Sequence, residues 1–556
     1  MALCIDPESQ LTRSNVDTLR YGAVSPIPIN HHHDEITNAS HHSPTTVLTP
    51  LQNHLGISEV FSSDQKPRRE RDDSFISDES LLFARAALAG GLAASMGYIY
   101  SIILQASVNT IWKIIPNAIH ATPAYIAVTI SFGGLLVGIL HALLDKSYTL
   151  PEFILDLSGK PSPQNVPTLF PALVHTLLLS IVTSSFAFSV GPEAPMISAG
   201  CMIGAALARH WYKDADGQGD DELMIKHLVL IYAGASGALT AFLEKPLAGS
   251  IFALELTNAS SNLATVELGP IIVASTLVPL LIKALIWPNA SMKAFFTYGE
   301  VGDLNSREAL AIGLGCGLVG AVLGTIFHQF VALLKGPLWS TRQEFGAQST
   351  GEESNKYNVI GFLTKRVVLV RALVGLAVGL LSMYYPTTMF WSEGTLQCAV
   401  DGHLTPFNAV QMGLSKTLTT AARVDTSIPF EDAWDAAQVG IFKFIAIVLA
   451  CAGKFPGGVI YPLFFAGASL AHAFVKLLPS ISSESVSPVV VMALMASSQS
   501  SVTRTPLATV VLLTVSATSL GTQISIMLPS VIVSSYVGVW FSRFLATGSY
   551  FRYSYE

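Results

Sequence analysis

The feature that most constrains this chain is a series of long apolar segments that recur between Leu81 and Leu545. Examples are LLFARAALAGGLAASMGYIYSIIL, which starts at Leu81, and AYIAVTISFGGLLVGILHALL, which starts at Ala124. About 20 consecutive apolar residues span a bilayer as a helix, so each segment predicts a membrane helix. Only 12% of the 556 residues are charged, about half of what soluble proteins carry. We therefore expect an all-α polytopic membrane protein.

Several classes of function are disfavoured by the same composition. A net charge of −7 gives no reason to expect a nucleic-acid partner. The five cysteines are scattered, which indicates neither a disulfide framework nor a metal site. The chain contains no H-E-x-x-H and no G-x-S-x-G motif, so an intramembrane enzyme is not supported. We expect no cofactor.

The first 78 residues differ from the rest because they are polar and lack hydrophobic periodicity, which is typical of a disordered tail. The start MALCIDPESQ resembles neither a signal peptide nor a transit peptide. The tract HHHDEITNASHH offers metal ligands, but its composition favours a solvated tail. KPRRER, at 66–71, precedes the first apolar segment and predicts a cytosolic N-terminus.

An internal repeat divides the remaining chain. GPEAPMISAG, from Gly191, matches GVIYPLFFAG, from Gly458, with two glycines, a proline and an alanine at the same 267-residue offset. PLAGSIFALELT, from Pro246, likewise matches PLATVVLLTVSAT, from Pro506. We expect two halves, at about 81–290 and 305–556. Repeated halves with broken helices are typical of transporters, whose substrate site lies where the halves meet.

The repeated motifs have the chemistry of helix starts. Gly457 and Gly458 allow close approach of a ligand to the backbone, and the amides of Val459 and Ile460 lie where a helix begins. Unpaired amides at the positive end of a helix dipole form an anion site. Glu193 holds the corresponding place in the first half, next to a segment where an ionisable group is costly. We infer that its carboxylate competes with a mobile anion as a gate.

Five segments, which follow one another along the chain in the family's order, resemble the CLC family of chloride channels and chloride/proton exchangers, and the resemblance extends from about Leu81 onward. GPEAP resembles the family's GREGP, and PGGVIYP resembles its GGIFxP. The other three are GASGALTAFLEKPLAGSIFALELT (from Gly234), FWSEGTLQ (from Phe390) and VTRTPL (from Val502).

The resemblance implies a CLC-type fold of two inverted-topology halves with discontinuous or tilted helices. It also implies a homodimer in a lipid membrane, with an anion pathway for chloride or another small anion in each subunit. The amides of Val459 and Ile460 would hold the anion, together with a hydroxyl and a terminal tyrosine. The tyrosine matches Tyr550, or Tyr553 if the register slips by three. C-terminal CBS modules, which eukaryotic members usually carry, are not expected.

Two departures from the family affect the anion site. The family's GSGIP is replaced by SYTLP, so Tyr148 stands where a small hydroxyl usually lies, and a one-residue slip would offer Ser147 instead. A phenol still donates a hydrogen bond but is larger. In GPEAP, proline replaces the usual arginine, which removes a positive charge beside Glu193.

A third departure concerns protons. Exchangers of the family generally carry two adjacent acids at the end of the PLAG helix, whereas this chain has Glu255 followed by Leu256 at the relay position. We therefore predict a voltage- or pH-gated chloride channel, with Glu255 as a paired structural acid. The alternative is a chloride/proton antiporter whose proton pathway uses Glu193 and Glu255, or Glu244. Glu244 lies beside Lys245, which predicts an ion pair. A nonconducting scaffold is a further alternative, because SYTLP departs from the family.

Overall fold

The computed structural model divides the chain into two units, Met1–Ser77 and Asp78–Glu556. The described residues from Asp78 onward belong to the second unit, and most of the predicted tail lies outside the described residues. The described residues are 73–144, 147–158, 161–168, 170–212, 221–245, 247–257, 265–286, 296–299, 301, 304–339, 366–404, 428–478, 486–517 and 522–545.

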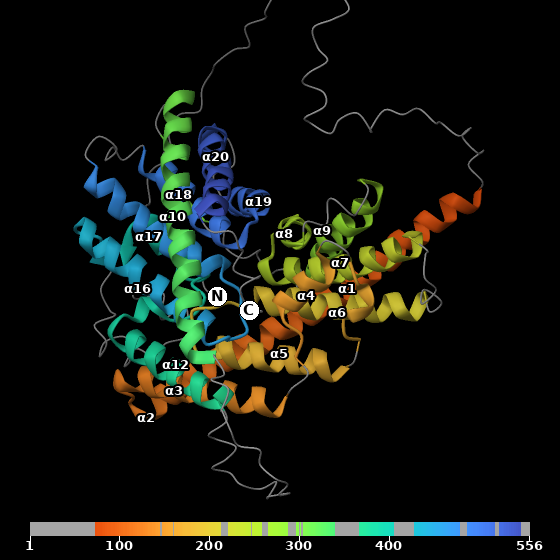
Figure 1. Cartoon of the computed structure of the whole chain (residues 1–556), viewed down its shortest axis with the longest axis horizontal. Coiled ribbons are helices and arrows are strands. Elements are labelled where there is room, and N and C mark those ends of the chain that lie inside the picture. Colours follow the sequence, from red (N-terminus) through yellow and green to blue (C-terminus); the bar gives the residue numbers. More distant parts are fainter. Residues whose placement is uncertain are drawn as a thin grey trace, which may run out of the picture. The chain divides into compact units, whose positions relative to one another are not determined.

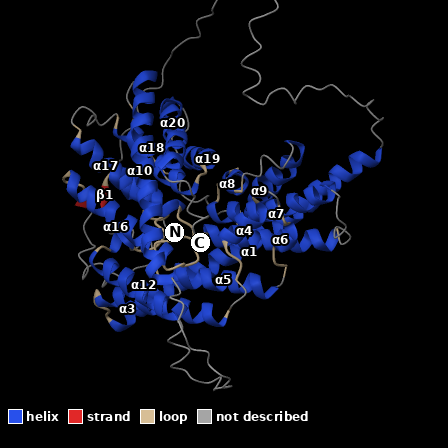
Figure 2. Cartoon of the chain, viewed as in Figure 1, coloured by secondary structure: helices blue, strands red, loops and turns tan. Residues whose placement is uncertain are grey.

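Helices account for almost all of the described structure (Figures 1 and 2). One pair of two-residue strands is the exception, with His403 opposite Pro429. The elements in chain order are α1 (Asp73–Asn109), a π-helical turn (Thr110–Ile114), α2 (Ile115–Ile119), α3 (Ala124–Leu143), α4 (Leu150–Leu157), a 3-10 turn (Pro163–Asn165), α5 (Phe170–Ser185), α6 (Glu193–Trp211), α7 (Asp221–Leu243), α8 (Ala248–Leu256), α9 (Thr265–Ile286), α10 (Ser306–Trp339), α12 (Arg366–Tyr384), a 3-10 turn (Pro386–Thr388), α13 (Leu396–Asp401), β1 (His403–Leu404), β2 (Ile428–Pro429), α16 (Ala433–Ala452), α17 (Ile460–Leu477), α18 (Ser487–Thr503), α19 (Pro506–Ser516) and α20 (Thr522–Leu545).

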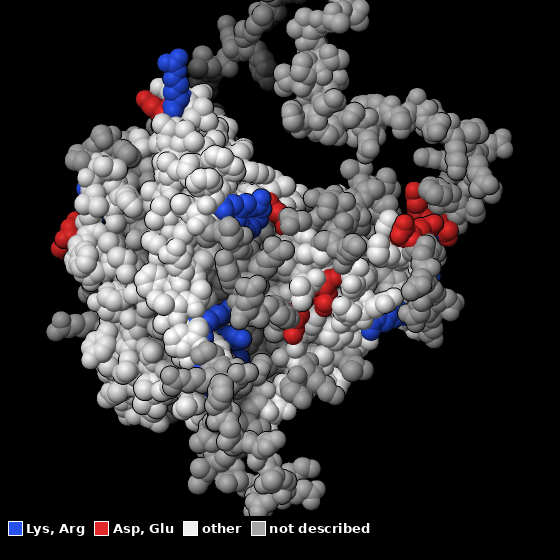
Figure 3. Space-filling view, viewed as in Figure 1, with Lys and Arg blue, Asp and Glu red and all other residues white. Residues whose placement is uncertain are grey.

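The lengths of these helices agree with the membrane class. Among the described residues, nine helices are long and apolar enough to cross a membrane. Others are too short to cross the roughly 30 Å hydrocarbon core at 1.5 Å per residue; α8 has 9 residues and α13 has 6. Charged side chains are sparse over the described surface in Figure 3. The chain is an all-α, multi-pass membrane protein that contains discontinuous helices.

The two predicted halves are visible as a repeated order of helices. In the first half α6 packs on α7, and α7 contacts both α8 and α9. In the second half α17 packs on α18, and α18 contacts both α19 and α20. The pair α8 and α19, which carry the second repeated motif, also contact each other. The repeat in the sequence therefore corresponds to a repeat of packed helices.

Glycines allow these helices to pack closely. A Cβ on Gly134 of α3 would lie 2.7 Å from the Cα of Gly375 on α12, so neither position admits a side chain without a shift. Small residues at such crossings let membrane helices approach until their backbones touch. The many glycines in the apolar segments are thus explained by helix contacts.

A buried lysine fixes the irregular chain between α12 and α13. Lys443 lies on α16 and is fully buried. Its Nζ donates to the carbonyl oxygens of Thr388, Met389 and Phe390 at 3.1, 3.2 and 2.7 Å. It also lies 3.5 Å from the Oγ of Ser189, in the segment that leads to α6. Since a buried charge requires hydrogen-bond partners, this lysine and the chain around it stabilise each other.

We expect Lys443→Met to lower the stability of the protein by about 3 kcal/mol or more, because the buried carbonyl groups of Met389 and Phe390 lose the donor described here and that of Thr388 keeps only the Ser189 hydroxyl. Thermal unfolding of the purified protein in detergent measures the effect. Lys226→Met is the matched control, since Lys226 forms an exposed ion pair with Glu222 at 2.7 Å, and such pairs contribute about 1 kcal/mol or less. Equal melting temperatures for the two variants would contradict the role of Lys443.

Candidate functional site

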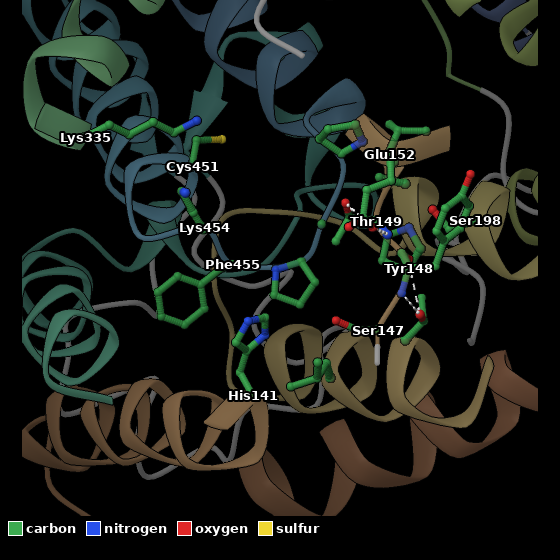
Figure 4. Close-up of a pocket in the computed structure, with 18 residues that line it drawn as sticks. His141, Ser147, Tyr148, Thr149, Glu152, Ser198, Lys335, Cys451, Lys454 and Phe455 are labelled. Atoms are coloured by element: carbon green, nitrogen blue, oxygen red, sulfur yellow. Dashed lines mark hydrogen bonds between the residues drawn. The ribbon is translucent and has the colours of Figure 1, made fainter. Parts of the chain in front are cut away.

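Three helix starts that are far apart in the sequence meet at one cavity of about 340 Å³. The residues around it come from the start of α4, the start of α6 and the segment before α17 (Figure 4). These are the segments SYTLP, GPEAP and PGGVIYP that the sequence analysis selected. Each helix presents the positive end of its dipole there, so the cavity favours an anion. The lining residues are His141, Ser147–Glu152, Thr176, Leu179, Ala194, Pro195, Ser198, Lys335, Cys451 and Lys454–Gly457.

The starts of α6 and α17 are joined through their backbones. Gly191 and Gly458, the first glycines of the two repeated motifs, form an isolated antiparallel bridge. The amide of Gly191 donates to the carbonyl oxygen of Gly458 at 2.8 Å, and the amide of Gly458 donates to the carbonyl oxygen of Gly191 at 2.5 Å. The two halves of the repeat therefore meet at equivalent residues.

Glu193 lies directly on this bridge. It is the first residue of α6 and is only 1% exposed. A Cβ built on Gly458 would lie 2.5 Å from its Oε2, and a Cβ on Gly191 would also overlap the carboxylate. The missing side chains of both glycines thus provide the space that the carboxylate fills. Glu193 stands against the start of α17, as the gate hypothesis requires.

The predicted anion-holding amides lie where α17 begins. Val459 is the N-cap of α17 and Ile460 is its first residue, and no side chain caps the helix. Both residues are buried. Gly457 lines the cavity. That these amides bind an anion stays a prediction. Tyr550 and Tyr553 lie outside the described residues.

Tyr148 lines the cavity but directs its hydroxyl elsewhere. The hydroxyl donates to Asp156 Oδ2 at 2.8 Å, and the backbone amide donates to Thr176 Oγ1 at 2.9 Å. Burial, followed by the nearby Cys201 and Asp156, raises the pKa of Tyr148, so the phenol stays protonated. The Tyr148 hydroxyl, which we expected to donate to the anion, therefore donates to Asp156 instead. Ser147, the alternative from a one-residue slip, also lines the cavity.

The two acids proposed as proton carriers have structural partners. Glu255 accepts hydrogen bonds from the amides of Leu507 and Ala508 at 2.9 and 2.7 Å, and so caps the start of α19. Leu256 is buried in the apolar core. Glu244 forms an ion pair, as we predicted, and its partner at 2.7 Å is Lys283 of α9. The turn at Glu244, which has a φ of 56°, directs its side chain toward α9.

Sequence reasoning missed the basic residues of the site. Lys335 and Lys454 line the cavity, and Lys443 supports the segment that precedes Glu193. The available signal was the position of Lys335 and Lys443 inside apolar segments, since an ionisable residue in a membrane helix indicates function. Among the described residues, no group of His, Cys, Asp and Glu could hold a metal ion.

The known proteins with similar sequences include a chloride channel protein. The chain is 22% identical over 350 residues to chloride channel protein CLC-f of Arabidopsis thaliana. The matched region covers 62% of this chain and 37% of that protein. The chain thus spans little more than a third of the length of this curated relative.

Solved structures share the fold. A slow cyanobacterial Cl⁻/H⁺ antiporter matches with a TM-score of 0.61 at 16% identity, over 85% of this chain and 96% of that one. A CLC-type fluoride/proton antiporter matches with a TM-score of 0.56 at 16% identity, over 85% and 97%. The sequence profile described as "Voltage gated chloride channel" matches residues 133–539, which is most of the membrane unit. The chain therefore belongs to the CLC family of voltage-gated chloride channels and transporters.

Proposed function

We propose that this protein is a chloride channel in which Glu193 gates the pathway by competing with the anion. The observation that carries the proposal is the contact of the Glu193 carboxylate with Gly458 at the start of α17. A carboxylate and a chloride ion have the same charge, and the dipole of α17 favours either one at its N-terminus. The anion enters when the carboxylate is protonated or moves away.

The lack of a relay acid favours a channel over an exchanger. A coupled exchanger must carry protons through the membrane on ionisable groups. Leu256, at the relay position, cannot bind a proton, and Glu255 is engaged by the first amides of α19. The two structural relatives are antiporters, and this keeps a chloride/proton antiporter as the second candidate. Since their likeness at 16% identity concerns the fold, the relay position carries more weight.

The proposed assembly follows from the family. We expect a homodimer with a separate pathway in each subunit and a cytosolic N-terminus, which KPRRER favours. The whole-protein activity is a proposal because the chain spans only 37% of CLC-f.

We expect Glu193→Ala to make chloride flux independent of pH between about 5 and 8, at a rate no lower than the maximum of the native protein. The variant has no carboxylate at the gate that could gain or lose a proton. Chloride efflux from liposomes measures this. Glu222→Ala, which removes an exposed carboxylate, is the control and should keep the native pH profile. A Glu193→Ala variant that also keeps that profile would refute the gate.

The close fit of Glu193 on Gly458 predicts energetic coupling between the two residues. Gly458→Ala places a Cβ 2.5 Å from Glu193 Oε2 and should destabilise the protein. Adding Glu193→Ala removes the overlap with the carboxylate and should restore about 1 kcal/mol or more of the loss. Thermal unfolding of the two single variants and the double variant measures the coupling. Gly315→Ala is a control, because a Cβ at Gly315 meets no atom within 4 Å. Additive effects would contradict the fit.

The channel proposal also predicts that chloride movement is not coupled to protons. Vesicles holding a chloride gradient, with no pH gradient and the voltage clamped at zero, should show no uphill proton movement. Glu255→Gln should destabilise the protein by about 1 kcal/mol through the weakened cap of α19, without changing proton movement. Proton transport at a fixed ratio to chloride would support the antiporter instead.

A further inference from the structure

One side of the cavity is basic. Lys335 of α10, Lys454 from the segment before α17 and His141 of α3 line it. In Figure 4 these three side chains lie on one side of the cavity, and Glu152 lies on the other. The three residues come from three separate elements, so the grouping results from the tertiary fold. It does not follow from any single sequence motif.

A buried arginine lies behind Lys454 and fixes it. The Nη2 of Arg371, on α12, donates to the carbonyl oxygen of Lys454 at 2.9 Å. Both cations pack on the indole of Trp339, with Lys454 Nζ at 5.0 Å and Arg371 Cζ at 5.8 Å from the ring centroid. Lys454 has a φ of 54°, which non-glycine residues seldom adopt. The contacts with Arg371 and Trp339 therefore hold the backbone and the ammonium group of Lys454 in place.

The charges of Arg371 and Lys454 are not paired with an acid among the described residues. Arg371 is only 2% exposed, and its Nε and Nη1 donate to no described atom. Burial, and then the charge of Arg371, lower the pKa of Lys454, which is consistent with two crowded cations.

Glu152, the acidic residue that lines the cavity, already has hydrogen-bond partners. Oε2 of Glu152 accepts hydrogen bonds from the amide and the hydroxyl of Thr149 at 2.5 and 2.9 Å, in the capping box of α4. The Glu152 carboxylate is therefore hydrogen-bonded to Thr149, and in Figure 4 it lies on the side of the cavity opposite to Lys335 and Lys454.

We propose that the basic side of the cavity, formed by Lys335 and Lys454 with Arg371 behind them, is a regulatory site for a doubly charged oxyanion. Two ammonium groups backed by a guanidinium attract a dianion about twice as strongly as they attract chloride at the same distance. Lysine binds phosphate as a point charge without requiring a fixed bidentate geometry. The ligand class is thus a phosphate or sulfate group, either free or on a lipid headgroup.

Binding at this site has a consequence for transport. Ala194, Pro195 and Gly457, which flank Glu193 and the start of α17, line the same cavity. An oxyanion held by Lys335 and Lys454 therefore occupies the approach to Glu193 and repels chloride from it. The site inhibits flux. This effect on flux rests on the proposed function, whereas the binding itself does not.

Binding is tested first with purified protein in detergent. Sodium sulfate, titrated at constant ionic strength with sodium chloride as the balancing salt, should raise the melting temperature in a saturable manner, because a ligand bound to the folded state stabilises it. The double variant Lys335→Gln/Lys454→Gln should bind at least tenfold more weakly. Lys454→Arg keeps the charge and should bind within about threefold of the native protein. Lys226→Gln removes a lysine outside the cavity and should leave binding unchanged.

Inhibition is tested in liposomes, with each variant normalised to its own chloride efflux without oxyanion. Sulfate or phosphate on the side that the cavity faces should inhibit native efflux, and the double variant should require at least tenfold more. Dioctanoyl phosphatidic acid provides the headgroup arm; inhibition by this lipid alone assigns the phosphate group to lipid. Absence of binding by sulfate, phosphate and the lipid, or equal binding by the double variant, overturns the site. Saturable binding to a protein that conducts no chloride keeps the site and refutes the proposed function.

Discussion

The pair of backbone hydrogen bonds between Gly191 and Gly458 is the constraint on which the site depends. It places the starts of α6 and α17 against each other, so two positive helix ends face the same small volume. Both residues lack a Cβ, and the Glu193 carboxylate fills the space that remains. A bulkier residue at either place would separate the helix ends or displace the carboxylate. The proposed gate therefore lies at the junction of the two halves.

Backbone groups stabilise two of the charged side chains that this fold holds inside it. Lys443 donates to three consecutive carbonyl oxygens, and Glu255 accepts from two consecutive amides. Both arrangements use the irregular chain at the ends of short helices, where backbone groups have no partner within the helix. Broken helices thus provide the backbone groups that stabilise these buried side chains, and amides of the same kind form the anion site that we propose at the start of α17. The basic side of the cavity differs, because Nε and Nη1 of Arg371 donate to no atom of the described residues.

The sequence predicted the class, the repeat and the location of Glu193, because these depend on local features. Apolar length defines membrane helices, and the 267-residue offset identifies Gly191 and Gly458 as equivalent positions. The directions of individual side chains were harder to predict. The hydroxyl of Tyr148 turns to Asp156, and Glu244 turns to Lys283; both depend on how separate segments pack. The group of Lys335, Lys454 and Arg371 combines three elements, and no local pattern reports such a meeting.

Lys443 has a consequence for how the protein is made. Its counterpart in the first half, 267 residues earlier, is Thr176, which holds the chain at Tyr148 through an uncharged hydroxyl. A lysine at the centre of a helix opposes membrane insertion by about 3 kcal/mol, so α16 is a poor insertion signal by itself. The carbonyl groups that accept from it, at 388–390, leave the ribosome before α16 does. Placing α16 in the bilayer therefore depends on this earlier segment, whereas Thr176 brings no charge into α5.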